Sequence, residues 1–97
     1  MDPLTPDTIQ TGLQELTGWN YDEHSLKKDF EFGDFKEAMS FLVRLAFHAE
    51  EANHHPEIWN VYNKVKITLT THDAGDRVTQ KDMDLAKTIE SFNWRKA

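Results

Sequence analysis

Residues 26–39 read LKKDFEFGDFKEAM, and the spacing of the apolar side chains changes within this stretch. From Leu26 to Phe32 the apolar residues fall on one side of a chain with a period of two, which is typical of a half-buried strand. Asp34 follows a glycine and has a glutamate three residues later, as in a capping box. From Phe35 onward apolar residues recur every three or four positions. The stretch therefore predicts a strand that is followed directly by an amphipathic helix.

This helix is expected to end near Asn53. Pro56 disfavours helical geometry in the residue before it, so residues 54–57, His-His-Pro-Glu, are predicted to form a turn or loop. The apolar stripe that we expect this helix to bury consists of Phe35, Ala38, Met39, Leu42, Leu45, Ala46 and Ala49, widened by Phe41, Val43 and Phe47.

The chain before residue 26 predicts one helix and one strand. Thr5 can cap a helix in which Pro6 takes the first position, and the apolar spacing ends near Leu16. Residues 19–22 are short, aromatic-rich and separated from residue 26 by polar residues. They are expected to pair with the strand at residues 26–32 as a hairpin.

The chain after the His-His turn alternates again. From Trp59 to Thr71 the apolar residues take odd positions, and the even positions are largely polar, which places His72 on the polar face at the end of a strand. Residues 60–64 can hold a turn that divides the stretch into two strands. A last helix is predicted after Thr79, which can cap toward Asp82. Its expected buried stripe is Leu85, Ala86, Ile89 and Phe92.

The predicted order is helix, two strands, helix, one or two strands, helix. Each helix has one apolar side, and the strands are polar on one face, so we expect a two-layer α+β fold with the helices on one face of an antiparallel sheet. Residues 1–97 are predicted to form a single domain, because a chain of 97 residues rarely holds two cores.

Composition excludes several classes of function. With 11 basic and 17 acidic residues, the net charge is −6, and such a field repels nucleic acids and anionic membranes. No segment approaches the roughly 20 apolar residues of a membrane span, and the N-terminus lacks a basic start and an apolar run. The sequence has no cysteine, which removes thiolate chemistry and disulfides. We therefore expect a cytoplasmic protein with neither a nucleic-acid nor a membrane partner.

Three of the five histidines, His54, His55 and His72, are predicted in loops or at the end of a strand. Histidine titrates near neutral pH, so two imidazoles that face one substrate can act as acid and base. The alternative is that they are exposed polar residues without a role. For His24, in the hairpin turn, and His48, on a helix face, we expect the second interpretation.

A metal site is a weaker hypothesis. The same three histidines could bind zinc together with Glu50, Glu51 or Asp73. Neighbouring histidines rarely reach one ion, and no pair of histidines shares a helix face at the spacing of a zinc protease. We therefore predict no metal. Serine nucleophile elbows and glycine-rich phosphate loops are absent from the sequence as well.

Two further features near the His-His turn allow two interpretations each. Trp59 and Tyr62 either wall a pocket for a flat ring or pack beneath the turn. Glu50 lies one helical turn before His54, so it either orients that imidazole or is an ordinary solvated carboxylate.

Residues 49–57 (AEEANHHPE), 60–65 (NVYNKV) and 67–73 (ITLTTHD), with a later Asp82 and Leu-Ala pair, strongly resemble pterin-4a-carbinolamine dehydratases. The resemblance extends from Trp19 through the last helix. It implies a four-stranded antiparallel sheet in the order α-β-β-α-β-β-α and assembly as homodimers or homotetramers. Two positions depart from the family: the loop at residues 73–79 is one residue longer, and Ile58, followed by Trp59, stands where an aromatic residue is frequent.

The resemblance also implies a reaction. The family dehydrates 4a-hydroxytetrahydropterin to quinonoid dihydropterin, in tetrahydropterin recycling, and it uses no metal or redox cofactor. Carried over by position, His54 and His72 form the acid–base pair and His55 completes the catalytic set. The implied substrate contacts also include Asn53, Thr70, Thr71 and Asp73, with Asp82 and Glu50 as supporting carboxylates.

A second function belongs to a different class. Animal members of the family also stabilise dimers of a homeodomain transcription factor, and some relatives are assembly factors. The resemblance thus leaves a non-catalytic interaction module, with a protein partner, as the alternative. Intact His54, His55 and His72 favour catalysis, because a scaffold need not keep all three.

Overall fold

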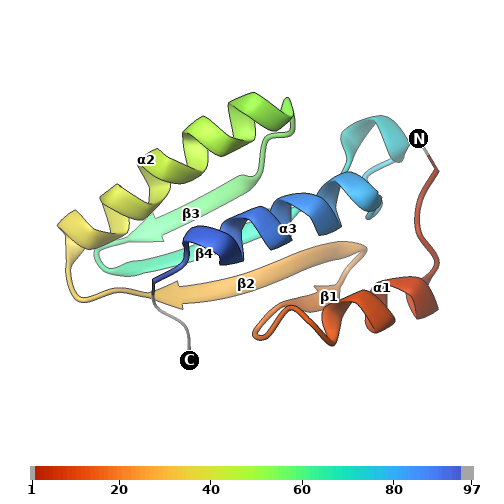
Figure 1. Ribbon diagram of the computed structural model, residues 1–97, viewed down its shortest axis with the longest axis horizontal. Coiled ribbons are helices and arrows are strands. Elements are labelled where there is room, and N and C mark those ends of the chain that lie inside the picture. The colour runs from red at the N-terminus through yellow and green to blue at the C-terminus, as the bar shows by residue number, and fades with distance from the viewer. Residues whose placement is uncertain (1, 95–97) are drawn as a thin grey trace.

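The computed structural model describes residues 2–94, which form one sheet with helices on one of its faces (Figure 1). The strands lie in the order β1-β2-β4-β3 and every neighbouring pair is antiparallel. The predicted α+β class and element order are therefore confirmed. The elements are α1 (Pro6–Leu13), β1 (Asn20–Asp22), β2 (Ser25–Glu31), α2 (Phe35–Ala52), β3 (Glu57–Val61), β4 (Lys64–Leu69), the short 3₁₀ helix η1 (His72–Ala74) and α3 (Gln80–Phe92).

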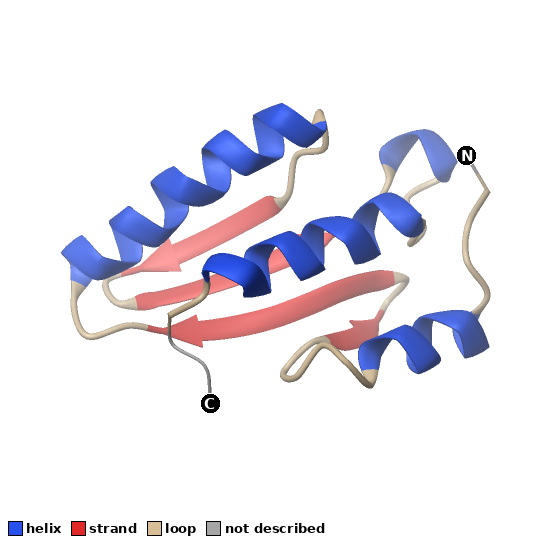
Figure 2. Ribbon diagram, viewed as in Figure 1, coloured by secondary structure: helices blue, strands red, loops and turns tan. Residues whose placement is uncertain are grey.

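The core lies between the sheet and the helices (Figure 2). In the central pair of strands, Leu26 lies opposite Leu69 and Phe30 opposite Val65, and all four are buried. Their neighbours in sequence alternate toward the uncovered face of the sheet. One continuous hydrophobic cluster joins these strands to α1, α2 and α3.

The first helix begins as predicted but ends earlier. Thr5 caps it, accepting a hydrogen bond from the Thr8 amide, and Pro6 is the first helical residue. The helix ends at Leu13, three residues before the expected end near Leu16. Residues 14–16 instead donate hydrogen bonds to carbonyls three residues back, which tightens the chain into turns while Leu16 stays buried.

The second helix confirms the predicted bounds and corrects part of the predicted stripe. Asp34 caps it by accepting from the Glu37 amide, and Asn53 ends it in the left-handed conformation. The fully buried face is narrower than expected, because Phe47 is 74% exposed. Phe47 lies two residues after Leu45, about 200° around the helix. Ala46, also expected on the stripe, is exposed, as are the large side chains of Phe35, Val43 and Phe47. The buried residues of the helix are Ala38, Phe41, Leu45 and Ala49.

The stretch after the His-His turn is a hairpin, which resolves the choice between one and two strands. Its turn lies at residues 62–63 and reverses the chain. Trp59 therefore lies opposite Lys66, whose ammonium sits 5.4 Å from the indole centroid, and Val61 lies opposite Lys64. The prediction that Trp59 and Val61 share the buried face of β4 was wrong, because the turn shifts which positions face the helices.

The segment between β4 and α3 also differs from the prediction. β4 ends at Leu69, and His72 begins η1 rather than ending a strand. The last helix begins after Thr79 with the expected capping box to Asp82, and its predicted apolar stripe is buried. Among the helices of residues 2–94, none is long and apolar enough to span a membrane.

Candidate active site

The C-terminal end of α2 and the start of α3 bring His54 and Asp82 together. His54 follows the left-handed Asn53, whose conformation turns the chain at the end of α2. Asp82 lies in the first turn of α3. His54 Nε2 is 2.6 Å from Asp82 Oδ1, and the two residues are 8% and 0% exposed. A buried carboxylate thus holds a largely buried imidazole across 28 residues of sequence.

The second oxygen of Asp82 is held by two donors. The Thr71 hydroxyl donates to Oδ2 at 2.8 Å, and the Thr79 amide donates at 2.9 Å. Because the Thr71 hydroxyl proton is used in this way, the Thr79 hydroxyl must donate to the Thr71 oxygen, 2.7 Å away. The Lys81 amide in turn donates to the Thr79 hydroxyl. The donor and the acceptor of each of these hydrogen bonds are therefore fixed.

The same network fixes the protonation pattern of the His54 ring. A carboxylate only accepts hydrogen bonds, so Nε2 carries a proton toward Asp82. In the neutral imidazole the other nitrogen, Nδ1, then carries the lone pair. His54 is thereby oriented as a group that can take up a proton at Nδ1.

His55 points away from this network and pairs with Glu50. His55 Nε2 is hydrogen bonded to Glu50 Oε1, and both side chains are exposed. Glu50 was expected either to orient His54 or to be free in solvent, and the structure shows a third arrangement. The turn at residues 53–55 rotates His54 toward α3, which leaves His55 as the imidazole that Glu50 can reach.

His72 lies on the exposed side of the same region. The chain places it directly after Thr71, whose hydroxyl binds Asp82, but its own side chain is 91% exposed. His72 Nδ1 is 3.0 Å from Asp76 Oδ1. This hydrogen bond and the charge of Asp76 raise the pKa of His72 above its ordinary value, and the charge of Asp73 adds to the effect.

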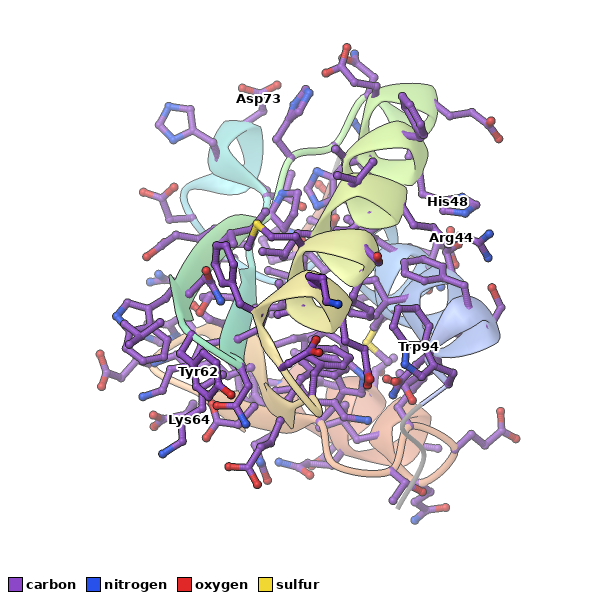
Figure 3. The ribbon with its side chains drawn as sticks, turned by 90° about the vertical axis from the view of Figure 1, so that its left-hand side faces the viewer. Arg44, His48, Tyr62, Lys64, Asp73 and Trp94 are labelled. Atoms are coloured by element: carbon purple, nitrogen blue, oxygen red, sulfur yellow. The ribbon has the colours of Figure 1, made fainter. Side chains whose placement is uncertain are left out.

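The remaining predicted site residues border this region. Asn53 is exposed at the end of α2, Thr70 is half-buried after β4, and Asp73 is exposed on η1. Figure 3 shows Asp73 on η1, apart from Tyr62 on the β3–β4 turn. The five residues of β3 separate Tyr62 from the His-His turn by about 16 Å. Tyr62 therefore does not wall the site.

Two other histidines lie away from the network. His24 occupies the β1–β2 turn with a positive φ of 64°. His48 stacks on Phe92, with 4.8 Å between ring centroids, and lines an apolar groove along α2 (Figure 3). Within residues 2–94, no cluster of three or more His, Asp or Glu side chains is arranged to hold a metal ion.

Sequence reasoning missed two partners in this region. Asp76 received no role, although its spacing of four residues from His72 across a glycine-containing turn is a usable signal. Thr79 was expected only to cap α3, whereas its hydroxyl also supports Thr71. No local pattern indicates that second contact, because it joins two segments through the tertiary fold.

Comparison with known proteins identifies the family. The family model described as pterin 4 alpha carbinolamine dehydratase matches residues 2–92. The chain belongs to the pterin-4-alpha-carbinolamine dehydratase family. Provisionally named dehydratases of this family from Opitutus terrae and a Nostoc species are 53% and 49% identical, over 94% and 93% of this chain and 94% and 96% of theirs.

Solved structures of dehydratase relatives share the fold. A transcriptional coactivator/pterin dehydratase from Brucella melitensis superimposes with a TM-score of 0.88 at 34% identity, covering 93% of this chain and 97% of that one. A pterin dehydratase-like protein identified as a RuBisCO assembly factor in the alpha-carboxysome gives a TM-score of 0.62 at 26% identity, covering 75% and 83%. The expected membership of the dehydratase family is confirmed, while the residue roles stay predictions.

Proposed function

We propose that the protein dehydrates a 4a-hydroxytetrahydropterin to the quinonoid dihydropterin, with His54 and His72 as the acid–base pair. The observation that carries the proposal is the Asp82 carboxylate, which binds His54 through Oδ1 and Thr71 through Oδ2. Thr71 is the residue before His72. One buried group therefore connects the two segments that bear the proposed catalytic imidazoles.

The chemistry requires two proton transfers. The C4a hydroxyl leaves as water after it takes up a proton, and N5 gives up its proton as the C=N bond forms. Imidazoles suit both transfers because their ordinary pKa lies near neutral pH, and each positioned transfer contributes roughly 10²- to 10⁴-fold to the rate. Since Asp82 holds Nε2 of His54, we assign Nδ1 of His54 as the atom that takes the N5 proton.

The remaining predicted residues are proposed to bind the pterin. His55 is held by Glu50, so its ring has a preferred orientation although it is exposed. Thr70 and Asp73 flank Thr71 and His72 on one side, and Asn53 precedes His54 on the other. These groups offer hydrogen-bond donors and acceptors to a polar heterocycle.

The proposed role is tetrahydropterin recycling, after a hydroxylase has formed the 4a-hydroxy compound. Self-association belongs to the same proposal, because Phe47, Val43 and Tyr62 are more than half exposed and such side chains gain free energy when a second subunit covers them. The cytoplasmic location expected from the sequence stays a prediction.

Stopped-flow measurement of 4a-hydroxytetrahydropterin dehydration, with and without the protein, tests the reaction. We expect a protein-dependent rate that falls roughly 10²-fold or more in His54→Ala and in His72→Ala. His48→Ala is the matched control, because His48 stacks on Phe92 away from the network. A rate equal to the uncatalysed one, in protein shown to be folded by circular dichroism, would refute the proposal.

A protein-binding role is the second candidate, supported by the apolar groove that Phe35, Met39 and Phe47 line on α2. The Brucella relative is titled a coactivator as well as a dehydratase, and the carboxysome relative an assembly factor. The proposed catalytic histidines lie outside this groove, whereas Val43 and Phe47 of the proposed self-association line it. A rate no higher than the uncatalysed one with folded wild-type protein would favour the binding role alone, whereas protein-dependent dehydration that survives His54→Ala and His72→Ala would overturn only the assignment of the two histidines.

A further inference from the structure

The loop after β4 folds back so that Asp76 meets His72. η1 occupies residues 72–74, and Gly75 and Asp76 then both adopt positive φ angles, 75° and 58°. Aspartate is one of the few residues that tolerate this left-handed conformation. The reversal returns the Asp76 carboxylate to the start of the loop, where Oδ1 lies 3.0 Å from His72 Nδ1.

Backbone hydrogen bonds close this loop at its base. The Thr71 carbonyl accepts from the amides of Ala74 and Asp76, and the Thr71 amide donates to the Arg77 carbonyl. The Thr71 side chain is anchored on the buried Asp82. The position of Asp76 is therefore set by the same residue that ties the loop to the His54 network.

We propose that Asp76 is a positioning residue that makes His72 the proton donor of the pair. By accepting the Nδ1 proton of His72, Asp76 directs Nε2 to the departing hydroxyl. The inference rests on the proposed dehydration and deepens it, because it assigns the acid and the atom from which the proton leaves.

The proton balance of this step is complete. The Nε2–H bond of the His72 imidazolium breaks, and its proton goes to the C4a oxygen. The C4a–O bond breaks with its electron pair and water leaves. The N5–H electron pair forms the new C=N bond as the N5 proton passes to Nδ1 of His54. His54 returns its proton to solvent, and solvent reprotonates the exposed His72.

The carboxylates around His72 favour its protonated form, which a proton donor requires. Asp76 and Asp73 both raise the pKa of His72, so the imidazolium persists to higher pH than in a free side chain. The other carboxylates of the region are engaged elsewhere: Glu50 with His55, and Asp82 with His54. A required acid loses activity as pH rises through its pKa, so removal of Asp76 should move the falling limb of kcat/KM to lower pH.

Two variants of Asp76 separate the effect of its charge from that of its whole side chain, and a third variant is the control. Asp76→Asn removes the charge and keeps the side-chain shape and the tolerance of positive φ. Asp76→Gly removes the side chain without straining the backbone. Asp84→Asn is the matched control, because the exposed Asp84 carboxylate bonds Gln80 on α3 and is not among the charges that raise the pKa of His72. Each is studied as the full chain by stopped-flow kinetics and by long-range ¹H–¹⁵N NMR, with His72→Gln to assign the His72 ring.

We expect His72 to carry its proton on Nδ1 in the wild-type protein and in Asp84→Asn, and on Nε2 in Asp76→Gly. Asp76→Gly should lower kcat about 2- to 10-fold. Asp76→Asn and Asp76→Gly should shift the falling limb to lower pH, with KM unchanged. An unchanged ring tautomer and pH profile in Asp76→Gly would overturn the role of Asp76 while leaving dehydration intact. Full turnover in His72→Gln would instead overturn the acid–base pair itself, whatever the NMR shows for Asp76.

Discussion

The contact between Asp82 and His54 predicts a specific failure of Asp82→Asn. The Thr79 backbone amide can only donate, and the Thr71 hydroxyl is already supplied with a donor by Thr79. The asparagine oxygen must therefore face these two groups, which turns its NH₂ toward His54 Nε2. His54 can then satisfy the contact only by moving its own proton to Nδ1. The group that we propose to accept the N5 proton is thereby blocked.

Asp82→Asn should lower both the free energy of unfolding and kcat, and the contacts of Asp82 set the size of each loss. Asp82 accepts three hydrogen bonds and is fully buried. Replacing charge-assisted bonds by neutral ones should cost about 2 kcal/mol of unfolding free energy. In a domain of this size such a loss lowers Tm by roughly 8–16 °C. Blocking one positioned proton transfer should lower kcat roughly 10²-fold or more.

Stopped-flow dehydration and thermal unfolding by circular dichroism measure the two effects on the same preparations. Asp84→Asn is the matched control, because Asp84 is exposed on the same helix and the hydrogen bond seen for its carboxylate is the one from Gln80. In a His54→Ala background, Asp82→Asn should lower kcat little further, since the imidazole that it orients is gone. Wild-type kcat together with wild-type Tm in Asp82→Asn would refute the argument for both roles.

Three other predictions concern the remaining residues. The double variant His54→Ala, His72→Ala should lose far less kcat than the product of the single losses, and a strictly multiplicative loss would show that the two act independently. His55→Ala should raise KM more than it lowers kcat, because we assign His55 to binding; a loss confined to kcat would contradict that assignment. Light scattering should give a mass above the 11.3 kDa of one chain, and Phe47→Glu should lower it; a monomer at every micromolar concentration would exclude self-association.

The starts of the three helices and the end of α2 could be predicted from local chemistry, while the end of α1 and the burial of individual side chains could not. Asp34 and Thr79 cap their helices through contacts three residues or fewer away, so the sequence alone indicates them. Phe47 has the hydrophobicity of a core residue, but its burial depends on how α2 is rotated over the sheet. Trp59 was assigned to the wrong face of the sheet, because the hairpin turn at residues 62–63 places Trp59 opposite Lys66, on the face away from the helices.

The same distinction applies to the site. His54 and His72 stand out in the sequence because one is predicted in a loop and the other at the end of a strand, where functional residues concentrate, and the family resemblance then suggests their roles. The partner of each imidazole depends on the turn geometry. The left-handed Asn53 determines that Asp82 meets His54 and Glu50 meets His55, and the left-handed Asp76 determines its own contact with His72. Backbone conformations of this kind are weakly encoded outside glycine.

The three imidazole–carboxylate pairs differ in what else depends on them. Asp82 caps α3 with the same carboxylate oxygen that binds Thr71, so a change at this position disturbs the helix start and the His54 ring together. Glu50 and Asp76 are exposed, and within residues 2–94 the hydrogen bond seen for each of these side chains is the one to its histidine. Substitution of Glu50 or Asp76 can therefore alter binding or proton transfer with little effect on folding. Variants of Asp82 should lose both activity and Tm. Variants of Glu50 or Asp76 should lose activity while Tm stays near the wild-type value. Comparison of activity with Tm across these variants therefore separates the carboxylate that also supports the fold from the two that act only at the site.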